Sequence, residues 1–447
     1  MKSIMPQLDP KSAVPIYIQL FDYIKDSILS GEIVHGEKLT SLRNLSESLG
    51  ISITTTALAY EQLEVEGYIV SKPRSGYFVR EVPAAVSKPT ASEDPSPSDL
   101  PAHKEKLLYD LSSFDFVKWK KCFSKVLNEY PEELLFESDP RGEAALRNEI
   151  AKYVYYSRGV RCTPEQIVIA AGMQQITALL ASLLKRMGIE HVAVEDPGYD
   201  PVISSFRDRS FAITKVPVER DGIKIEKLPA NIQTAAYVNP SNQFPTGAVM
   251  PIARRYQLLD WATANNSYII EDDYDSELRY IGRPIPAMQG LDTQDRVIYL
   301  GSFSSTLFAA IKISYMVMPG ALADIYRDIS STYTQTCSKA EQLTLALFMQ
   351  KGYYQTGIKR IRRLYSQKLS AVIEAFDGDE DIQTLNTFSG INVLLRSEDE
   401  NVISRILTRS ASLGIRMQQL DEKELIFYYN QIPLEEIPKL IEELRKK

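Results

Sequence analysis

The chain has 447 residues, of which 44% are hydrophobic and 24% charged, so its composition is that of a globular protein with two or three domains. A net charge of −7 excludes a protein that coats nucleic acid over its whole surface, although one small face can still bind DNA. Three separated cysteines and no Cys/His cluster indicate neither a disulfide framework nor a metal site. The absence of an 18-residue apolar run argues against a membrane span, and we expect a cytoplasmic protein.

The first 80 residues carry the pattern of three helices followed by a hairpin. Apolar spacing and stop signals predict the helices between Pro15 and Gly31, over 41–49 and over 52–66. Two short apolar strands, 68–70 and 77–79, then flank a basic turn at 72–76. This order predicts a helix-turn-helix with a β-wing, whose third helix reads the major groove, but the pattern alone fits a small packing domain equally well.

A longer motif favours the DNA-binding alternative. Residues 39–79, LTSLRNLSESLGISITTTALAYEQLEVEGYIVSKPRSGYFV, resemble the winged-helix domain of GntR-family regulators, whose pattern is LPSxRxLAxxLGVSRxTVxxAYxxLxxEGYLxxxxGSGTFV. Together with the hydroxyls and positive charges of the segment, the resemblance marks as DNA-binding candidates Ser41, Arg43, Ser52, Thr54, Thr55, Tyr60, Lys72, Arg74 and Ser75. Thr40, Ile53 and Arg74 replace a proline, an arginine and a glycine of the pattern, so we expect an operator sequence different from those of relatives.

The composition changes after the hairpin. Almost no apolar side chain occurs between Ser87 and Ser98, and prolines recur among serines and acidic residues. This composition predicts a semi-extended linker over residues 81–108.

From residue 109 onward, short apolar runs alternate with amphipathic stretches for more than 300 residues. The apolar runs lie at 167–170, 191–194, 235–238, 268–270 and 297–300, and the helical stretches include 174–187 and 254–264. The alternation predicts an α/β domain with a mainly parallel sheet, helices on both faces and a smaller lobe over the last residues. In such sheets ligands bind at the carboxyl ends of the strands.

Several stretches at these strand ends resemble the fold-type I aminotransferase-like domain of the MocR/GabR-type subfamily of GntR regulators. They are 171–175 (AGMQQ), 270–280 (IEDDYDSELRY) and 297–307 (VIYLGSFSSTL), with further matches at 139–142 (DPRG), 195–199 (EDPGY) and 240–247 (PSNQFPTG). The resemblance covers nearly the whole chain in the order of the family, and it implies a site for pyridoxal 5'-phosphate (PLP).

The resemblance also implies a role for each candidate site residue. The group that would hold the phosphate consists of Gly172, Met173, Gln174, Ser302, Ser304 and Lys312. Asp272 would pair with the pyridine nitrogen and Tyr274 would bond to the phenolic oxygen, while Asn242 lies in a matching cofactor stretch and Tyr199 would stack on the ring. Each of these features taken singly has a structural explanation as well as a functional one. A glycine can simply form a turn, an acidic loop can simply be solvated, and a tyrosine after a turn can belong to the core.

Ser305 is the departure that bears most on the chemistry. The family motif GTFSKTL supplies the lysine that forms the Schiff base with PLP, and Ser305 stands at that lysine's position. A hydroxyl cannot form an imine, so covalent attachment of the cofactor at Ser305 is excluded. Lys312 replaces the phosphate-binding arginine of the family. It keeps the positive charge but lacks the planar guanidinium that can donate two parallel hydrogen bonds to a phosphate. The stretch 425–430 also lacks the arginine that holds an amino acid's carboxylate in family members, which argues against an effector held in that way.

Three explanations of Ser305 stay open. They are an engineered Lys→Ser change, a natural lineage that binds PLP without a covalent bond, and a lineage that has lost the cofactor. The presence of Gly172, Asp272, Tyr274 and Ser302 argues against a long-standing loss.

We therefore expect a DNA-binding transcription regulator, not an enzyme, with a winged helix over 1–80, a linker over 81–108 and an aminotransferase-like domain over 109–447. It is expected to form a homodimer, to bind double-stranded operator DNA and to respond to PLP or a small-molecule effector. The alternatives are an aminotransferase with an appended DNA-binding domain and a large domain that serves only for dimerisation.

Overall fold

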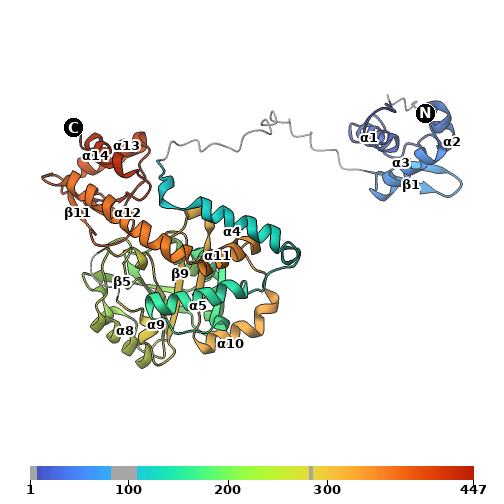
Figure 1. The fold of residues 1–447 in the computed structure, drawn as a ribbon. Helices are drawn as coiled ribbons and strands as arrows, with labels where there is room; N and C mark the ends of the chain where they lie inside the picture. Colours follow the sequence, from blue (N-terminus) through green and yellow to red (C-terminus); the bar gives the residue numbers. More distant parts are fainter. Residues whose placement is uncertain (1–7, 82–107, 281–284, 447) are drawn as a thin grey trace. The chain divides into compact units, whose positions relative to one another are not determined.

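The computed structural model describes residues 8–81, 108–280 and 285–446, and the chain divides into two compact units, Met1–Ala102 and His103–Lys447 (Figure 1). Apart from its two end residues, the predicted linker over 81–108 lies outside the described residues. Each unit is described below by itself.

The small unit contains every predicted element of a winged helix-turn-helix. Its helices and strands are α1 (Ile16–Leu29), α2 (Leu42–Leu49), α3 (Ile53–Val65), β1 (Ile69–Lys72) and β2 (Gly76–Val79). The Ser52 hydroxyl caps α3 by accepting a hydrogen bond from the Thr55 N–H at 3.0 Å, which satisfies one of the free donors at the helix start. The first strand begins one residue later than predicted and continues to Lys72, which pairs with Gly76 across the hairpin.

The small unit has its own hydrophobic core. Buried side chains from all three helices and from the hairpin meet in it, among them Leu20, Ile24, Leu45, Leu63 and Val79. The helices are thereby held against the wing by burial of apolar surface.

The large unit is built on a mainly parallel sheet, as predicted, and the sheet has eight strands. The strands are β3 (Ile167–Ala171), β4 (His191–Asp196), β5 (Ala212–Glu219), β6 (Gly222–Ile223), β7 (Thr234–Val238), β8 (Tyr268–Asp272), β9 (Val297–Ser302) and β10 (Ile313–Val317). Their order is β3-β10-β9-β8-β7-β4-β5-β6, with parallel pairing from β9 through β5. Three of these strands were not predicted from the sequence: β5 and β6 at one edge of the sheet, and β10, which runs antiparallel between β3 and β9.

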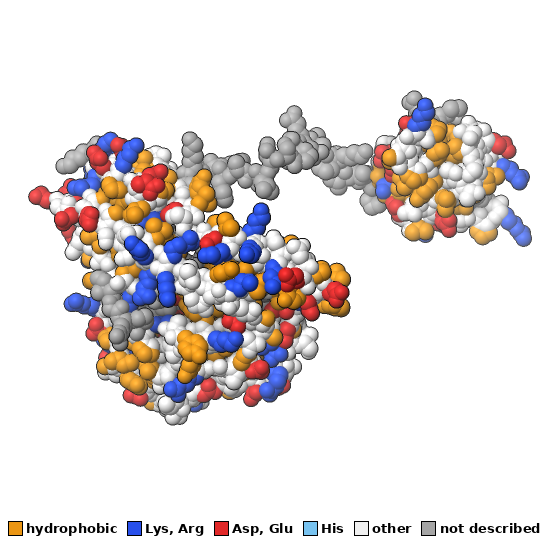
Figure 2. Space-filling model, viewed as in Figure 1, with side chains coloured by type: hydrophobic (Ala, Val, Ile, Leu, Met, Phe, Trp, Pro, Cys, Tyr) orange, Lys and Arg blue, Asp and Glu red, His pale blue; other side chains and the backbone are white. Residues whose placement is uncertain are grey.

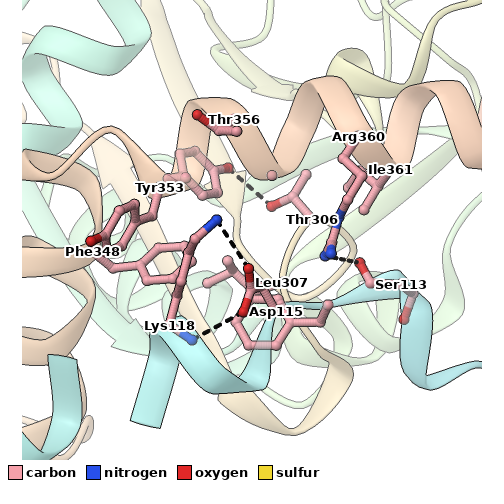
Figure 3. A pocket seen from close by; sticks show the side chains of 13 residues that line it. Ser113, Asp115, Lys118, Thr306, Leu307, Phe348, Tyr353, Thr356, Arg360 and Ile361 are labelled. Atoms are coloured by element: carbon pink, nitrogen blue, oxygen red, sulfur yellow. Dashed lines mark hydrogen bonds and ion pairs between the residues drawn. The ribbon is translucent and has the colours of Figure 1, made fainter. Parts of the chain in front are cut away.

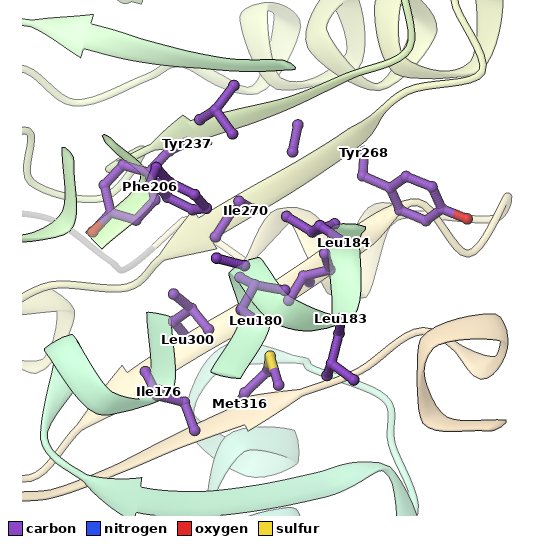
Figure 4. Packing of buried hydrophobic residues seen from close by; sticks show 14 of the residues in the cluster. Ile176, Leu180, Leu183, Leu184, Phe206, Tyr237, Tyr268, Ile270, Leu300 and Met316 are labelled. Carbon is purple, nitrogen blue, oxygen red and sulfur yellow. The ribbon is translucent and has the colours of Figure 1, made fainter. Parts of the chain in front are cut away.

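Helices cover both faces of this sheet. The helices of this part are α5 (Ala144–Arg158), α6 (Met173–Arg186), α7 (Asp200–Arg207), α8 (Ile252–Ala264), α9 (Met288–Leu291), α10 (Gly320–Ile329) and α11 (Lys339–Gln350). Figure 4 shows Leu180 and Leu184 of α6 packed near Ile270, Leu300 and Met316 of the strands. The neighbouring strand residues point to the opposite face, where they join clusters that contain α5, α8 and α11.

The last part of the chain forms the predicted smaller lobe. It contains α12 (Tyr353–Phe376), α13 (Glu400–Leu413), α14 (Ile437–Arg445) and an antiparallel sheet of β11 (Gln383–Leu385), β12 (Asn392–Arg396), β14 (Glu424–Tyr428) and β13 (Met417–Gln419), in that order. Near the start of the unit lies α4 (Phe116–Glu129), which packs on α11. Within the described ranges, no helix is both long and apolar enough to cross a membrane.

Candidate cofactor site and nucleic-acid interface

Asp272 ends β8 as a buried carboxylate at the carboxyl edge of the parallel strands. Its Oδ2 accepts a hydrogen bond from the Tyr237 hydroxyl on β7, and the Asn239 side-chain amide donates to its carbonyl oxygen at 3.1 Å. Burial raises the pKa of Asp272 to about 6, although the hydrogen bonds from Tyr237 and Asn239 act in the opposite direction. A carboxylate in this position can accept a hydrogen bond from a protonated ring nitrogen while both groups stay shielded from water.

The loop after β8 is fixed by a second buried acid. Asp273 forms an ion pair with Arg158, whose Nε lies 2.7 Å from Asp273 Oδ2. The same carboxylate accepts hydrogen bonds from Tyr299 at 2.6 Å and from Ser241 and Ser276 at 2.8 Å. These contacts hold the backbone on either side of Asp273 and so position both Asp272 and Tyr274.

The predicted phosphate-binding residues gather at one end of three neighbouring strands. In the strand register, Ile313 pairs with Ala171 and Ser314 pairs with Ser302, so β10 brings the ends of β3 and β9 together. The hydroxyl of Ser302 accepts hydrogen bonds from the Ser314 hydroxyl at 3.0 Å and the Ser304 N–H at 3.3 Å.

Gly172 and Lys312 are adjacent at this end of the sheet. Gly172 precedes α6 with a φ of 87°, and a Cβ placed on it would lie 3.6 Å from Lys312 Cδ. The first-turn N–H groups of α6, including those of Met173 and Gln174, have no acceptor within the helix, and no acidic residue stands in that turn. Free donors, the positive end of the helix and a lysine make this place suited to a phosphate.

Aromatic rings line the other side of the candidate site. Tyr199 and Tyr274 each make an edge-to-face contact with Phe244, with ring centroids 5.8 Å and 6.1 Å apart respectively. Tyr199 is 39% exposed, unlike an ordinary core tyrosine, while burial raises the pKa of Tyr274 well above its usual value. Asn242 is buried, and its Oδ1 accepts a hydrogen bond from Ser389 at 3.0 Å.

Ser305 is half-buried in the turn that follows β9. Its hydroxyl lies close to the carboxylate of Asp275, a residue to which the sequence motifs gave no role. Tyr237 and Asn239 were also missed, because no motif marks them and their approach to Asp272 depends on β7 and β8 being neighbours in the sheet.

A cavity of about 50 Å³ lies on the other side of this turn (Figure 3). Thr306 and Leu307, the two residues after Ser305, line it together with Asp115, Lys118 and Arg360. Asp115 pairs with Lys118, and Arg360 donates to the Ser113 carbonyl at 3.3 Å. Figure 2 shows Lys and Arg side chains gathered on this face, over α4 and α12. None of the predicted cofactor residues lines the cavity.

Most of the DNA-binding candidates lie on the surface of the small unit. Exposed side chains are those of Ser41, Arg43, Ser52, Thr54, Lys72, Arg74 and Ser75. Ser41 and Ser52 also act as helix caps, and the half-buried Thr55 shares a hydrogen bond of 2.8 Å with Ser52. At the wing, the Lys72 ammonium lies 4.7 Å from the centre of the Phe78 ring.

Tyr60 does not fit its predicted role as a DNA contact. Its side chain is fully buried in the core, and its hydroxyl donates to the Thr40 carbonyl at 2.9 Å. Tyr60 therefore fixes the segment before α2 against α3, and it reaches neither bases nor phosphates. The family pattern contains this tyrosine, but a position in a motif does not separate core residues from contacts.

Two families match the chain. The description "Bacterial regulatory proteins, gntR family" applies to residues 16–79, and "Aminotransferase class I and II" applies to residues 110–421.

The relatives that match over both units include two transcription regulators. The HTH-type transcriptional regulator YdeL of Bacillus subtilis is 41% identical over 405 residues, which are 88% of this chain and 86% of YdeL. MocR of Rhizobium meliloti, a probable rhizopine catabolism regulatory protein, is 33% identical over 81% of this chain and 77% of MocR.

Among solved structures, LysN of Thermus thermophilus resembles the large unit. LysN is an alpha-aminoadipate aminotransferase, crystallised with N-(5'-phosphopyridoxyl)-L-leucine. Its TM-score is 0.65 at 24% sequence identity, over 76% of this chain and 90% of LysN. This likeness establishes the aminotransferase fold of the large unit.

Proposed function

Because this chain belongs to the MocR/GabR-type branch of the GntR transcription regulators, in which a winged helix is joined to an aminotransferase-like domain, we propose that its large domain senses PLP or a small effector bearing an amino group. The winged helix would bind double-stranded operator DNA through the exposed first turn of α3 and through the wing. Such a protein works in the cytoplasm, where it meets its DNA.

One juxtaposition carries the proposal. The buried Asp272 ends β8, and the adjacent Gly172 and Lys312 lie at the same edge of the sheet, at the ends of β3 and β10. Between β8 and β10 in the strand order, β9 ends in the turn in which Ser305 stands at the position of the Schiff-base lysine. When bound, PLP would supply an electron-poor ring and a reactive aldehyde. Asp272 would hold a proton at the ring nitrogen, and Lys312 with the start of α6 would bind the phosphate. Since Ser305 offers no amine, the ligand would exchange with solution, as a sensor requires.

Binding would act on DNA by favouring one arrangement of the two domains over another. A gel-shift titration of the full chain, with and without added PLP, tests this coupling. We expect PLP to change the DNA concentration at half-saturation. A folded protein that binds no DNA in either state would contradict the proposal, and steady transamination by this chain would favour the alternative of an aminotransferase with an appended DNA-binding domain.

Absorbance spectra test the state of the cofactor site directly. With added PLP, Ser305→Lys should develop an absorbance band at about 420 nm from a protonated imine, and the unsubstituted chain should not. A band in both chains would mean that another lysine forms the imine. A band in neither would favour the alternative in which the large domain only mediates dimerisation.

We further propose that the large unit forms a homodimer. Large apolar side chains are exposed around α4 and α5: Val117 (80%), Leu135 (83%), Phe136 (70%) and Tyr156 (85%). Orange side chains gather beside the end of α4 in Figure 2. Exposed apolar side chains of this size are typical of protein interfaces, and a second copy of this chain is the occupant that would bring two winged helices to one operator.

A further inference from the structure

Asp275 is a buried acid that the proposed sensing chemistry does not use. It adopts a left-handed conformation with a φ of 51°, immediately before the short 3-10 helix Ser276–Leu278, and its side chain is 3% exposed. Among the described residues, no donor makes a well-directed hydrogen bond to either of its carboxylate oxygens. A carboxylate without directed partners is costly to bury and indicates a missing ligand or cation.

The surroundings of Asp275 place it at the cofactor site. A Cβ placed on Gly390, where φ is 84°, would lie 2.9 Å from Asn242 Nδ2 and 3.8 Å from Asp275 Oδ2. The Asn242 amide and the Asp275 carboxylate therefore converge on the same small space, next to the Ser305 hydroxyl. Asn242 is itself one of the predicted cofactor-binding residues.

None of the groups that dominate the electrostatics of Asp275 is a cation. Burial raises its pKa to about 7, Glu277 and Asp272 act in the same direction, and only the nearby hydroxyl groups of Ser305 and Tyr274 act against the increase. A lysine at position 305 would carry an ammonium group into these surroundings. Serine is shorter and uncharged. The Asp275 carboxylate is therefore present, but residue 305 supplies no positive charge to pair with it.

We infer that this site selects ligands that bring their own protonated primary amine, with Asp275 as the acceptor of that ammonium and Ser305 beside it. The ligand class is the amine form of the cofactor, pyridoxamine 5'-phosphate, bound without a covalent bond. Asp275 is thereby a specificity-determining residue. The inference rests on the proposed function, because it assumes that Asp272 and the Gly172–Lys312 pair hold the ring and the phosphate.

The test compares two ligands that differ at one group. Pyridoxamine 5'-phosphate carries an ammonium where pyridoxine 5'-phosphate carries a hydroxyl, and their dissociation constants for the full-length chain can be measured by calorimetry. A buried charge-assisted hydrogen bond should favour the amine by about 10- to 100-fold. In Asp275→Asn, where asparagine tolerates the left-handed backbone, the ratio of the two constants should fall to about 1.

Two further variants complete the test. Asp260→Asn, an exposed change on α8, should keep the ratio of the full chain, while Ser305→Lys should lose it because its own ammonium occupies Asp275. Equal affinities for both ligands, or a preference that persists in Asp275→Asn, would overturn the inference and leave the proposed cofactor site standing. Failure of both phosphorylated ligands to bind a folded chain would overturn the inference and the proposed sensing function together.

Discussion

Asp273 follows Asp272 in the chain, but its carboxylate is committed to Arg158 and to three hydroxyl groups. Arg158 ends α5, so the pair joins a helix on one face of the sheet to the loop that carries Asp272. Replacement of one member of a buried ion pair leaves the other charge without compensation, which costs far more than removal of both.

Arg158→Met should therefore lower the free energy of unfolding of the large unit by about 3–5 kcal/mol, measured by urea denaturation. Adding Asp273→Asn in the same chain removes the stranded charge and should recover part of that loss. If the double variant is no more stable than Arg158→Met alone, the stranded charge is not the cause.

Glu195 provides a pH signature of the same buried region. It lies near the end of β4 with a side chain that is 1% exposed, and it accepts hydrogen bonds from the Asn239 N–H and the Gln243 amide. Burial raises the pKa of Glu195 to about 8, although these two hydrogen bonds act against the increase. The folded state therefore keeps its proton at pH values where the unfolded chain has already lost it.

The sign of the effect follows from proton binding. Stability contributed by Glu195 is fully present below its unfolded pKa of about 4.5 and is lost as pH rises through the folded value near 8, by about 1.4 kcal/mol per pH unit at most. We expect the free energy of unfolding of the ligand-free chain to fall between pH 5 and pH 8.5. Glu195→Gln should flatten this slope, and an unchanged slope would contradict the assignment.

At the scale of elements, five strands of the large sheet (β3, β4, β7, β8 and β9) and the helices of the winged helix could be predicted from apolar spacing, with ends that shift by one or two residues. The strands β5 and β6 at one edge of the sheet were missed, because the side chains of β5 are mostly exposed or half-buried and β6 has only two residues. The strand β10 was missed because Ile313–Val317 is a short buried run directly after a predicted phosphate residue, and its partners β3 and β9 are set by tertiary pairing. The motifs identified Gly172, Asp272 and Lys312 as candidates. The contact of Tyr237 with Asp272 and the position of Asp275 depend on strand order and loop conformation, which no local pattern encodes.

The start of α3 is the element on which DNA recognition should depend. Ile53 is the first residue of α3 and is 48% exposed, at the position of an arginine in the family pattern. Ile53→Arg should add one phosphate contact, so affinity for a random-sequence duplex should rise and the slope of log K against log salt should steepen by about 1. Fluorescence anisotropy at several salt concentrations measures both.

Val65→Arg is the matched control, since it places the same charge at the exposed far end of the same helix. It should change the salt slope much less than Ile53→Arg. Equal effects of the two substitutions would mean that charge acts on the whole small unit and that the first turn has no special contact.

At the scale of the whole molecule, the proposed homodimer makes a prediction for the exposed apolar residues of the large unit. Phe136→Glu would put a charge into the interface and should shift the chain from dimer to monomer at micromolar concentration in sedimentation analysis. Ile232→Glu alters a residue that is 53% exposed in the turn before β7, and it should remain dimeric. A dimer that survives Phe136→Glu would exclude this surface as the interface.

Each hydrophobic cluster of the described residues lies within one of the two units, and the small unit closes a core of its own. A substitution inside one core therefore changes first the packing of the cluster that contains it. If the proposed roles hold, the small unit could change its operator through positions such as Ile53 and Arg74 while the large unit keeps its proposed ligand site. On the proposed function, the same modularity would let a change at position 305 alter the sensed molecule without changing which gene responds.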